Sequence, residues 1–326
     1  MPPTLRATVA LIALSIVSLS GTAQVRKISP EEAMDGALDM KRASEKADKL
    51  TEDGSRYCKW GIASLDTSDL NVAISRFLLN HGSNVPGNVP ASKMWRVSIV
   101  AADIINQFAM KVSECDLRLR HSDQARDVFL SASSALQKLI MVRGKFDELA
   151  YQQTIWQEQS TPAPGNDESP ERQVLGTGKV ATGEILNVAR EMKGSAEAAV
   201  MASAASRKNP ACIHPDIQDK APDFTDLTKL IDYMARLSGS NRAIPAANMW
   251  GVASACDAAQ VDILSAIEAC STYAGDKEEA RNAATESLRA YHRLTEAIAA
   301  FDELALRQTE WEEMSEAQNE SVILEQ

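Results

Sequence analysis

The stretch FDELAYQQTIWQE, from Phe146 to Glu158, decides the fold because it occurs again as FDELALRQTEWEE, from Phe301 to Glu313. The two copies are 155 residues apart, and the same offset pairs PASKMWRV (90–97) with PAANMWGV (245–252). Without a gap, 20 of the 71 positions from 90 to 160 match their counterparts. This self-similarity indicates an internal duplication, so the fold and any site are predicted once per repeat.

The recurring stretch ends a helical pattern with a seven-residue period. One set of positions in the first repeat is Ala125, Ala132, Leu139, Phe146 and Gln153, and the second repeat keeps it as Ala280, Ser287, Leu294, Phe301 and Gln308. A sustained heptad of small and large apolar groups predicts helices packed as a bundle. The two glutamines are polar at these positions, and we expect them to fix helix register through hydrogen bonds.

Start and stop signals predict four helices in each repeat. The expected fold is all-α, a tandem duplication of an up-down-up-down four-helix bundle with long third and fourth helices. In repeat 1 (24–160), Ser29 and Glu32 form a capping box for a first helix that ends near Asp53, before Gly54. The other expected starts in repeat 1 are Thr67, Pro90 and the turn at 121–122. Repeat 2 (183–326) has expected helices from Ile185 to about Arg207, after Asp223, from Pro245, and from Asp276 to about Glu316.

Two segments lie outside the repeats. Residues 1–23 have a positive Arg6, an apolar run from Val9 to Leu19 and small residues before Gln24, which is the pattern of a signal peptide. The run is too short to span a bilayer, which needs about 20 residues. We therefore expect a soluble chain exported to the periplasm or the extracellular space; the alternative is an uncleaved N-terminal anchor. Residues 161–182 hold three prolines and three glycines, which predicts a flexible linker.

Composition narrows the classes of partner. The formal charge is −11, and removal of Arg6 with the predicted signal peptide makes it −12. An acidic chain without a basic stripe argues against nucleic acid and against anionic membrane surfaces as partners. Aromatic residues make up only 5% of the chain, which favours close-packed helices over a sheet sandwich.

The five cysteines also follow the repeat. Cys115 and Cys270 are 155 residues apart, and Cys58 and Cys212 are 154 apart. One disulfide per repeat is therefore expected, Cys58–Cys115 and Cys212–Cys270, and export makes such bonds plausible. Cys256 has no counterpart, so we expect a buried free thiol. The alternative for Cys256 is a disulfide to another molecule.

Catalytic and metal-binding patterns are missing from the sequence. None of the four histidines lies three or four residues from another, and no G-x-S-x-G elbow or paired-cysteine motif occurs. His292 lies beside the heptad positions rather than on them, which favours a surface histidine over a haem ligand. The prediction is therefore no catalytic residue, no metal and no cofactor.

One stripe of the fourth helix is not explained by the heptad. Asp147, Ala150, Thr154 and Glu158 are identical to Asp302, Ala305, Thr309 and Glu313, and they lie about 140° away from the heptad positions. Incomplete divergence, or a face where the two repeats touch, would explain the identity. The sharper hypothesis is an acidic stripe that each repeat presents to a protein partner, with Asp147, Thr154, Glu158, Asp302, Thr309 and Glu313 as binding residues.

Three functions remain open at this point. The preferred one is a non-enzymatic, exported protein-interaction module with two similar bundles. The alternatives are a carrier of a small ligand or haem in the bundle interior, and a hydrolase with a site assembled between the domains. We further expect Trp95 to contact Phe146, and Trp250 to contact Phe301, as core-filling rings.

Overall fold

The computed structural model describes residues 26–58, 65–81, 89–116, 123–160, 179–210, 212, 225–239, 243–273 and 278–324. The described residues form α-helices and no strand, which confirms the all-α prediction. The helices, in chain order, are α2 (Pro30–Cys58), α3 (Ser68–His81), α4 (Ala91–Asp116), α5 (Asp123–Ser160), α6 (Thr182–Lys208), α7 (Thr225–Gly239), α8 (Ala246–Tyr273) and α9 (Glu278–Leu324).

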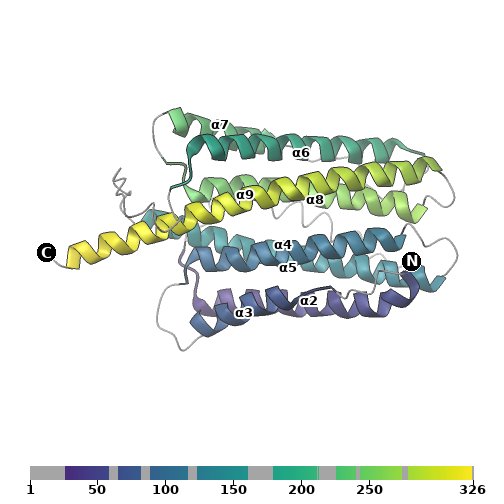
Figure 1. Ribbon diagram of the computed structural model, residues 1–326, viewed down its shortest axis with the longest axis horizontal. Helices are drawn as coiled ribbons and strands as arrows, with labels where there is room; N and C mark the ends of the chain where they lie inside the picture. Colours follow the sequence, from purple (N-terminus) through teal and green to yellow (C-terminus); the bar gives the residue numbers. More distant parts are fainter. Residues whose placement is uncertain are drawn as a thin grey trace.

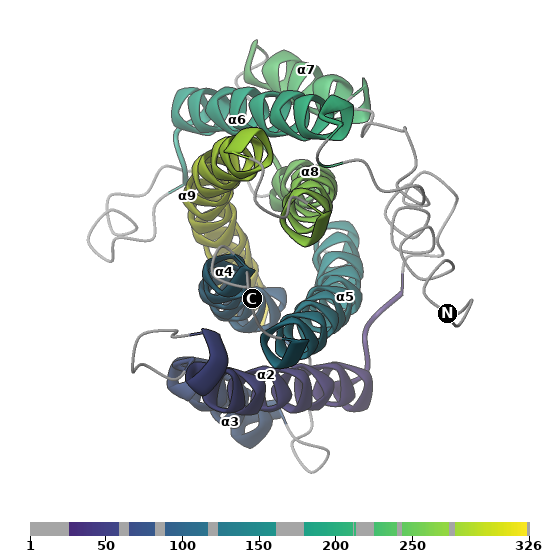
Figure 2. The same ribbon diagram turned by 90° about the vertical axis from the view of Figure 1, so that its right-hand side faces the viewer.

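The helices pack in layers along one long axis (Figure 1). Seen end-on, α4, α5, α8 and α9 lie in the middle, α2 and α3 cover one side, and α6 and α7 cover the other (Figure 2). In repeat 1, α5 packs against both α2 and α4, and in repeat 2, α9 packs against both α6 and α8. The middle layer joins the repeats because α4 packs against α9 and α5 against α8.

One hydrophobic core therefore runs through both repeats. Its fully buried members include Phe108 and Phe146 from repeat 1 and Met249 and Phe301 from repeat 2. The boundaries predicted at 160 and 183 stay a prediction, because residues 161–178 lie outside the described residues. The candidate functional site lies among the side chains that are buried between the two repeats.

The predicted register role of the glutamines is visible in the contacts of Gln153. Its side chain is fully buried, accepts a hydrogen bond from the Ile28 amide at 2.9 Å and donates one to the Val89 carbonyl at 2.8 Å. The starts of α2 and α4 therefore meet the late part of α5, so α5 runs antiparallel to both. In repeat 2, Gln308 accepts a hydrogen bond from the Val180 amide at 3.3 Å, just before α6.

The first helices of the two repeats correspond at an offset of 152, three residues less than the fourth helices. Helix α2 begins at residue 30 and α6 at residue 182. The buried positions Ala33, Ala37, Met40, Ala47 and Thr51 match Ile185, Ala189, Met192, Ala199 and Ser203. Ser29 and Glu32 form the predicted capping box, with each backbone amide bound by the other side chain at 3.2 Å. Ala181, at the equivalent of Ser29, offers no side-chain cap.

Several predicted helix ends were wrong. Helix α2 continues through Gly54 to Cys58, because one glycine costs a helix only about 1 kcal/mol and does not by itself end it. Helix α9 continues past Glu316 to Leu324 through residues with adequate helix propensity. The third helices are long, as predicted, with 26 residues in α4 and 28 in α8, and the first helices α2 and α6, with 29 and 27 residues, are of similar length.

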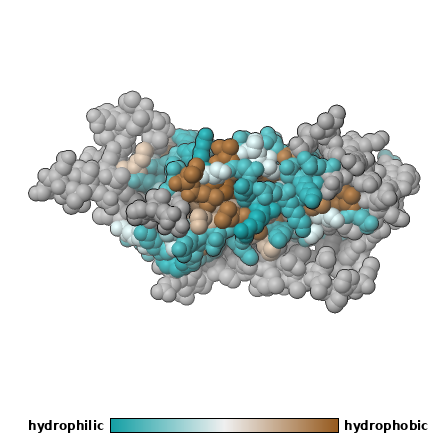
Figure 3. Space-filling model, turned by 90° about the horizontal axis from the view of Figure 1, so that it is seen from below, coloured by the Kyte–Doolittle hydropathy of each residue, from teal (hydrophilic) through white to brown (hydrophobic). Residues whose placement is uncertain are grey.

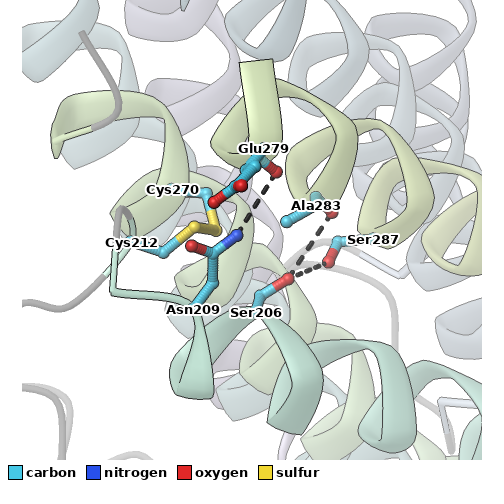
Figure 4. Close-up of a disulfide and its surroundings, with 7 residues drawn as sticks. All are labelled: Ser206, Asn209, Cys212, Cys270, Glu279, Ala283 and Ser287. Atoms are coloured by element: carbon cyan, nitrogen blue, oxygen red, sulfur yellow. Dashed lines mark hydrogen bonds between the residues drawn. A yellow bond between two sulfur atoms is a disulfide. The ribbon is translucent and has the colours of Figure 1, made fainter. Parts of the chain in front are cut away.

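Cys212 and Cys270 form the predicted disulfide, 58 residues apart in sequence (Figure 4). The bond ties the segment after α6 to α8, beside hydrogen bonds from Asn209 to the Glu279 carbonyl and between Ser206 and Ser287. Cys256 is a buried free thiol, as predicted. The side chains of Cys58 and Cys115 lie outside the described residues, so their disulfide stays a prediction.

Candidate functional site

The stripe that recurs on α5 and α9 lies between the repeats and is buried. Asp147 is 6% exposed, and Thr154, Asp302 and Thr309 are each 2% exposed. The alanines of the stripe, Ala150 and Ala305, are fully buried, and its glutamates, Glu158 and Glu313, are half-buried. The hypothesis of an acidic stripe open to an outside partner is therefore wrong, because each copy faces the other repeat. The alternative, a face where the repeats touch, describes what the structure shows.

The centre of this contact is a pair of tryptophans. Trp95 of α4 and Trp250 of α8 stack with ring centroids 3.7 Å apart and planes 6° apart. Each indole N–H donates a 3.0 Å hydrogen bond to a threonine of its own repeat, Trp95 to Thr154 and Trp250 to Thr309. These bonds satisfy the polar edge of a buried ring and hold it in the stacking plane.

The structure gives neighbours for Phe146 other than Trp95, and the expected contacts Trp95–Phe146 and Trp250–Phe301 stay predictions. Phe146 meets Phe77 of α3 edge-on, with ring centroids 6.2 Å apart. It also lies against Gly36 of α2. Phe146 therefore fills the core of repeat 1, whereas Trp95 faces repeat 2.

The glutamates of the stripe bind the first turns of helices in the opposite repeat. Glu158 of α5 accepts a hydrogen bond from the Ala247 amide of α8 at 2.8 Å. Glu313 of α9 accepts one from the Ser92 amide of α4 at 3.0 Å, and the Ser92 hydroxyl donates a second. A carboxylate at a helix N-terminus satisfies amides that have no intrahelical acceptor and favours the positive end of the helix dipole.

The residue before each glutamate binds the same helix start from within its own repeat. The Ala91 amide donates to Gln157 at 3.1 Å, and the Ala246 amide donates to Glu312 at 3.0 Å. Each of the motifs Pro-Ala-x-x-Met-Trp is thus held by one side chain from each repeat. The two Pro-Ala-x-x-Met-Trp motifs therefore occupy equivalent surroundings in the two repeats.

A buried ionic cluster, made of Arg143, Asp147, Asp257 and Asp302, lies further along the contact. Arg143 of α5 lies 3.2 Å from an Asp147 oxygen, 3.8 Å from Asp257 of α8 and 3.9 Å from Asp302 of α9. Ser98 of α4 donates a hydrogen bond to Asp147 and accepts one from Arg143 at 3.2 Å. One guanidinium thus serves three carboxyl groups, two of them from the other repeat.

The cluster is asymmetric, although the aspartates Asp147 and Asp302 are repeat mates. The position equivalent to Arg143 in repeat 2 is Ile298, and the position equivalent to Asp257 in repeat 1 is Ala102. Repeat 2 therefore contributes two carboxyl groups and no cation of its own. Its charge is offset only through contact with Arg143 of repeat 1.

Burial controls the ionisation of this cluster. It raises the pKa of Asp147 to about 6, against the opposing effect of Arg143. Burial also raises the pKa of Asp302 well above its ordinary value, again opposed by Arg143, and the neighbouring carboxylates raise it further. The pKa of Asp257 rises for the same first cause. The Asp257 side chain is 23% exposed and that of Asp302 only 3%, so we assign the strongest proton affinity to Asp302.

Sequence reasoning missed Arg143 and Asp257, and a signal for Arg143 was present. Arg143 precedes Asp147 by one helical turn, so it extends the same stripe. Identity between the repeats does not mark either residue. The positions equivalent to Arg143 and Asp257 are the apolar Ile298 and Ala102. A position that is charged in one repeat and apolar in the other is the pattern that would have identified Arg143 and Asp257.

Comparisons with known proteins give no relatives for this chain. No family model, no curated protein and no solved structure matches it. Within the part of the chain that the structure describes, no group of histidine, cysteine and carboxylate side chains has the arrangement to hold a metal ion. None of the described helices combines the length and the apolar character needed to cross a bilayer.

Proposed function

We propose that this chain is an exported, non-enzymatic scaffold that binds another protein through its outer helices. The observation that carries the proposal is the outward face of α3, where Leu79 is 79% exposed and Val72 is 46% exposed. These residues are seven apart, so they lie on the same side of the helix. Large apolar side chains that stay exposed together on one face are typical of protein contact sites.

The face that carries α2 and α3 supports this proposal. Viewed from that side, hydrophobic residues form a cluster left of centre beside hydrophilic surface, with smaller hydrophobic areas to the right (Figure 3). Helix α7, the outer helix of repeat 2, exposes one large apolar side chain, Tyr233, which is 44% exposed, among Lys229, Asp232 and Arg236. Helix α3 exposes two aliphatic side chains, so we take α3 as the helix that contacts the proposed partner.

The inner helices have a structural role in this proposal. We infer that the chain arose by duplication of a unit of four helices, and that the stripe on α5 and α9 is retained because it joins the two copies. The recurring Trp95, Thr154 and Glu158 each take part in that contact. The duplicated residues therefore hold the two repeats together, and the outer helices, which differ in sequence, provide specificity.

Export is part of the proposal and is supported by two features. Residues 1–23 have the pattern of a signal peptide. The Cys212–Cys270 disulfide suits an oxidising compartment. N-terminal sequencing of the purified protein should find Gln24 as the first residue; an intact Met1 in the exported protein would contradict cleavage.

The test of the binding proposal compares two surface variants. The double variant Val72→Asp with Leu79→Asp places charges on the proposed face, and Met201→Asp, at a 73% exposed position of α6, is the matched control. Each protein is immobilised and exposed to envelope and secreted extracts of its source, and bound proteins are quantified by mass spectrometry. We expect a protein that the wild type and Met201→Asp recover equally and the double variant does not. Equal recovery by all three would overturn the proposal.

A further inference from the structure

We propose that the ionic cluster between the repeats is a proton-operated latch: the contact tightens when Asp302 binds a proton and loosens when that proton is lost. The latch acts on the contact between the two repeats and does not depend on the proposed partner.

The geometry leaves Asp302 poorly compensated as an anion. Asp147 and Ser98 take the short contacts of Arg143, whereas Asp302 is 3.9 Å from the guanidinium. The second oxygen of Asp302 is buried and has no hydrogen-bond partner. A buried carboxylate without hydrogen bonds is costly, and the neutral acid removes most of that cost.

The charged groups that act on Asp302 are mostly negative. They are Arg143 and Asp147 on α5, Asp257 on α8 and Asp103 on α4, with Cys256 and Tyr291 close to the same charges. Arg143 is the one cation among the groups that act on Asp302. Ionisation of all the carboxyl groups would leave buried negative charge in excess, so the closed contact favours keeping a proton.

Separation of the repeats removes this bias. Arg143 and Asp147 belong to repeat 1, whereas Asp257 and Asp302 belong to repeat 2, so opening exposes each carboxyl group to water. In the open state the pKa of Asp302 returns toward its ordinary value, and the closed state therefore binds more protons. A rise in pH then favours opening, by up to about tenfold per pH unit for each proton released.

The reactivity of Cys256 reports opening in the full-length chain. Its thiol is buried in α8, next in sequence to Asp257 of the cluster. We expect opening of the contact to increase its exposure to an alkylating reagent. The rate of its alkylation is followed by peptide mass spectrometry from pH 5 to pH 8 in the wild type and in Asp302→Asn. The amide side chain of the variant imitates the neutral acid and does not titrate. Burial raises the pKa of the Cys256 thiol, and the Asp302 carboxylate raises it further, so the direct effect of that carboxylate would slow the wild type at high pH, opposite to the increase that opening predicts.

We expect a rate ratio near 1 at pH 5 and a wild-type rate at least about tenfold higher than that of Asp302→Asn at pH 8. The control Glu303→Gln removes a charge from an exposed neighbour on α9 and should follow the wild type at every pH. A ratio that does not change between pH 5 and pH 8 would overturn the latch. If Asp302→Asn does not fold, Asp257→Asn is measured in the same way, and an unchanged ratio there has the same meaning.

Discussion

Trp95 and Trp250 stack face to face across the contact between the two repeats, with ring centroids 3.7 Å apart. They occupy equivalent positions in the two copies, so the same surface meets itself, as in a symmetric dimer. Around this stack, each repeat binds the other's helix start through Glu158 or Glu313. Equivalent side chains thus make the contact from both sides.

Removal of one ring should destabilise the whole chain. Trp95→Ala loses a fully packed aromatic partner and leaves a cavity, so we expect a loss of about 3–5 kcal/mol in the free energy of unfolding. Urea denaturation measures it. Trp156→Ala serves as the control, since that ring is only half-buried and should cost less. Equal losses would mean that the stack adds nothing beyond ordinary burial.

Both glutamate caps should contribute to stability. Glu313→Ala removes acceptors for the amide and the hydroxyl of Ser92, and Glu158→Ala removes the acceptor of the Ala247 amide. We expect a loss of about 1–3 kcal/mol for each variant in thermal or urea unfolding. Glu303→Ala, at an exposed site, should change little. Losses as small as that of Glu303→Ala would contradict the two caps.

Two glycines provide a matched test of packing. A Cβ on Gly36 would lie 2.8 Å from the Phe146 ring, whereas a Cβ on Gly194 meets nothing within 4 Å. Gly194→Ala should stabilise the protein by about 0.5–1 kcal/mol through helix propensity. Gly36→Ala should lower stability by about 1–3 kcal/mol because the ring must move. Chemical denaturation of Gly36→Ala and Gly194→Ala measures both effects. Stabilisation by both variants would show that the Phe146 ring can move aside without loss of stability.

Loss of the cluster's cation should be costly in a pH-dependent way. Arg143→Met leaves three carboxyl groups without their partner, so we expect a loss of about 3–5 kcal/mol at pH 8. Burial raises the pKa of Asp147 to about 6 even beside Arg143. A raised pKa means stability that is present in acid and is lost as pH rises, so the variant should lose less at pH 5. Urea unfolding at both pH values tests this; a larger loss at pH 5 would reverse the assigned sign.

Reduction of the Cys212–Cys270 bond should lower stability without touching the contact between the repeats. The bond spans 58 residues, for which the chain-entropy treatment gives about 4 kcal/mol. Calorimetry of the wild type and of Cys212→Ser with Cys270→Ser should show a clear drop in melting temperature. Cys256→Ala, which removes a free thiol, should cost less. An unchanged melting temperature in the double variant would count against the bond in solution.

The sequence predicted the helices well where local signals were strong. The capping box of Ser29 and Glu32, the starts near Pro90 and Pro245, and the Cys212–Cys270 pairing all appear in the structure. Each depends on residues close in sequence or on the repeat offset. The end of α2 was misjudged because a lone Gly54 is a weak stop signal when packing supports the helix.

What the sequence determined by itself is that Asp147, Thr154 and Glu158 recur on a face that the heptad leaves unexplained. Periodicity places residues on a helix face, but it does not say whether water, a partner or another helix covers that face. Only the tertiary structure decided this, by packing α4 and α5 against α8 and α9. That packing brings Arg143 of repeat 1 close to Asp257 and Asp302 of repeat 2. The low polarity of the interior then disfavours the charged form of these carboxyl groups.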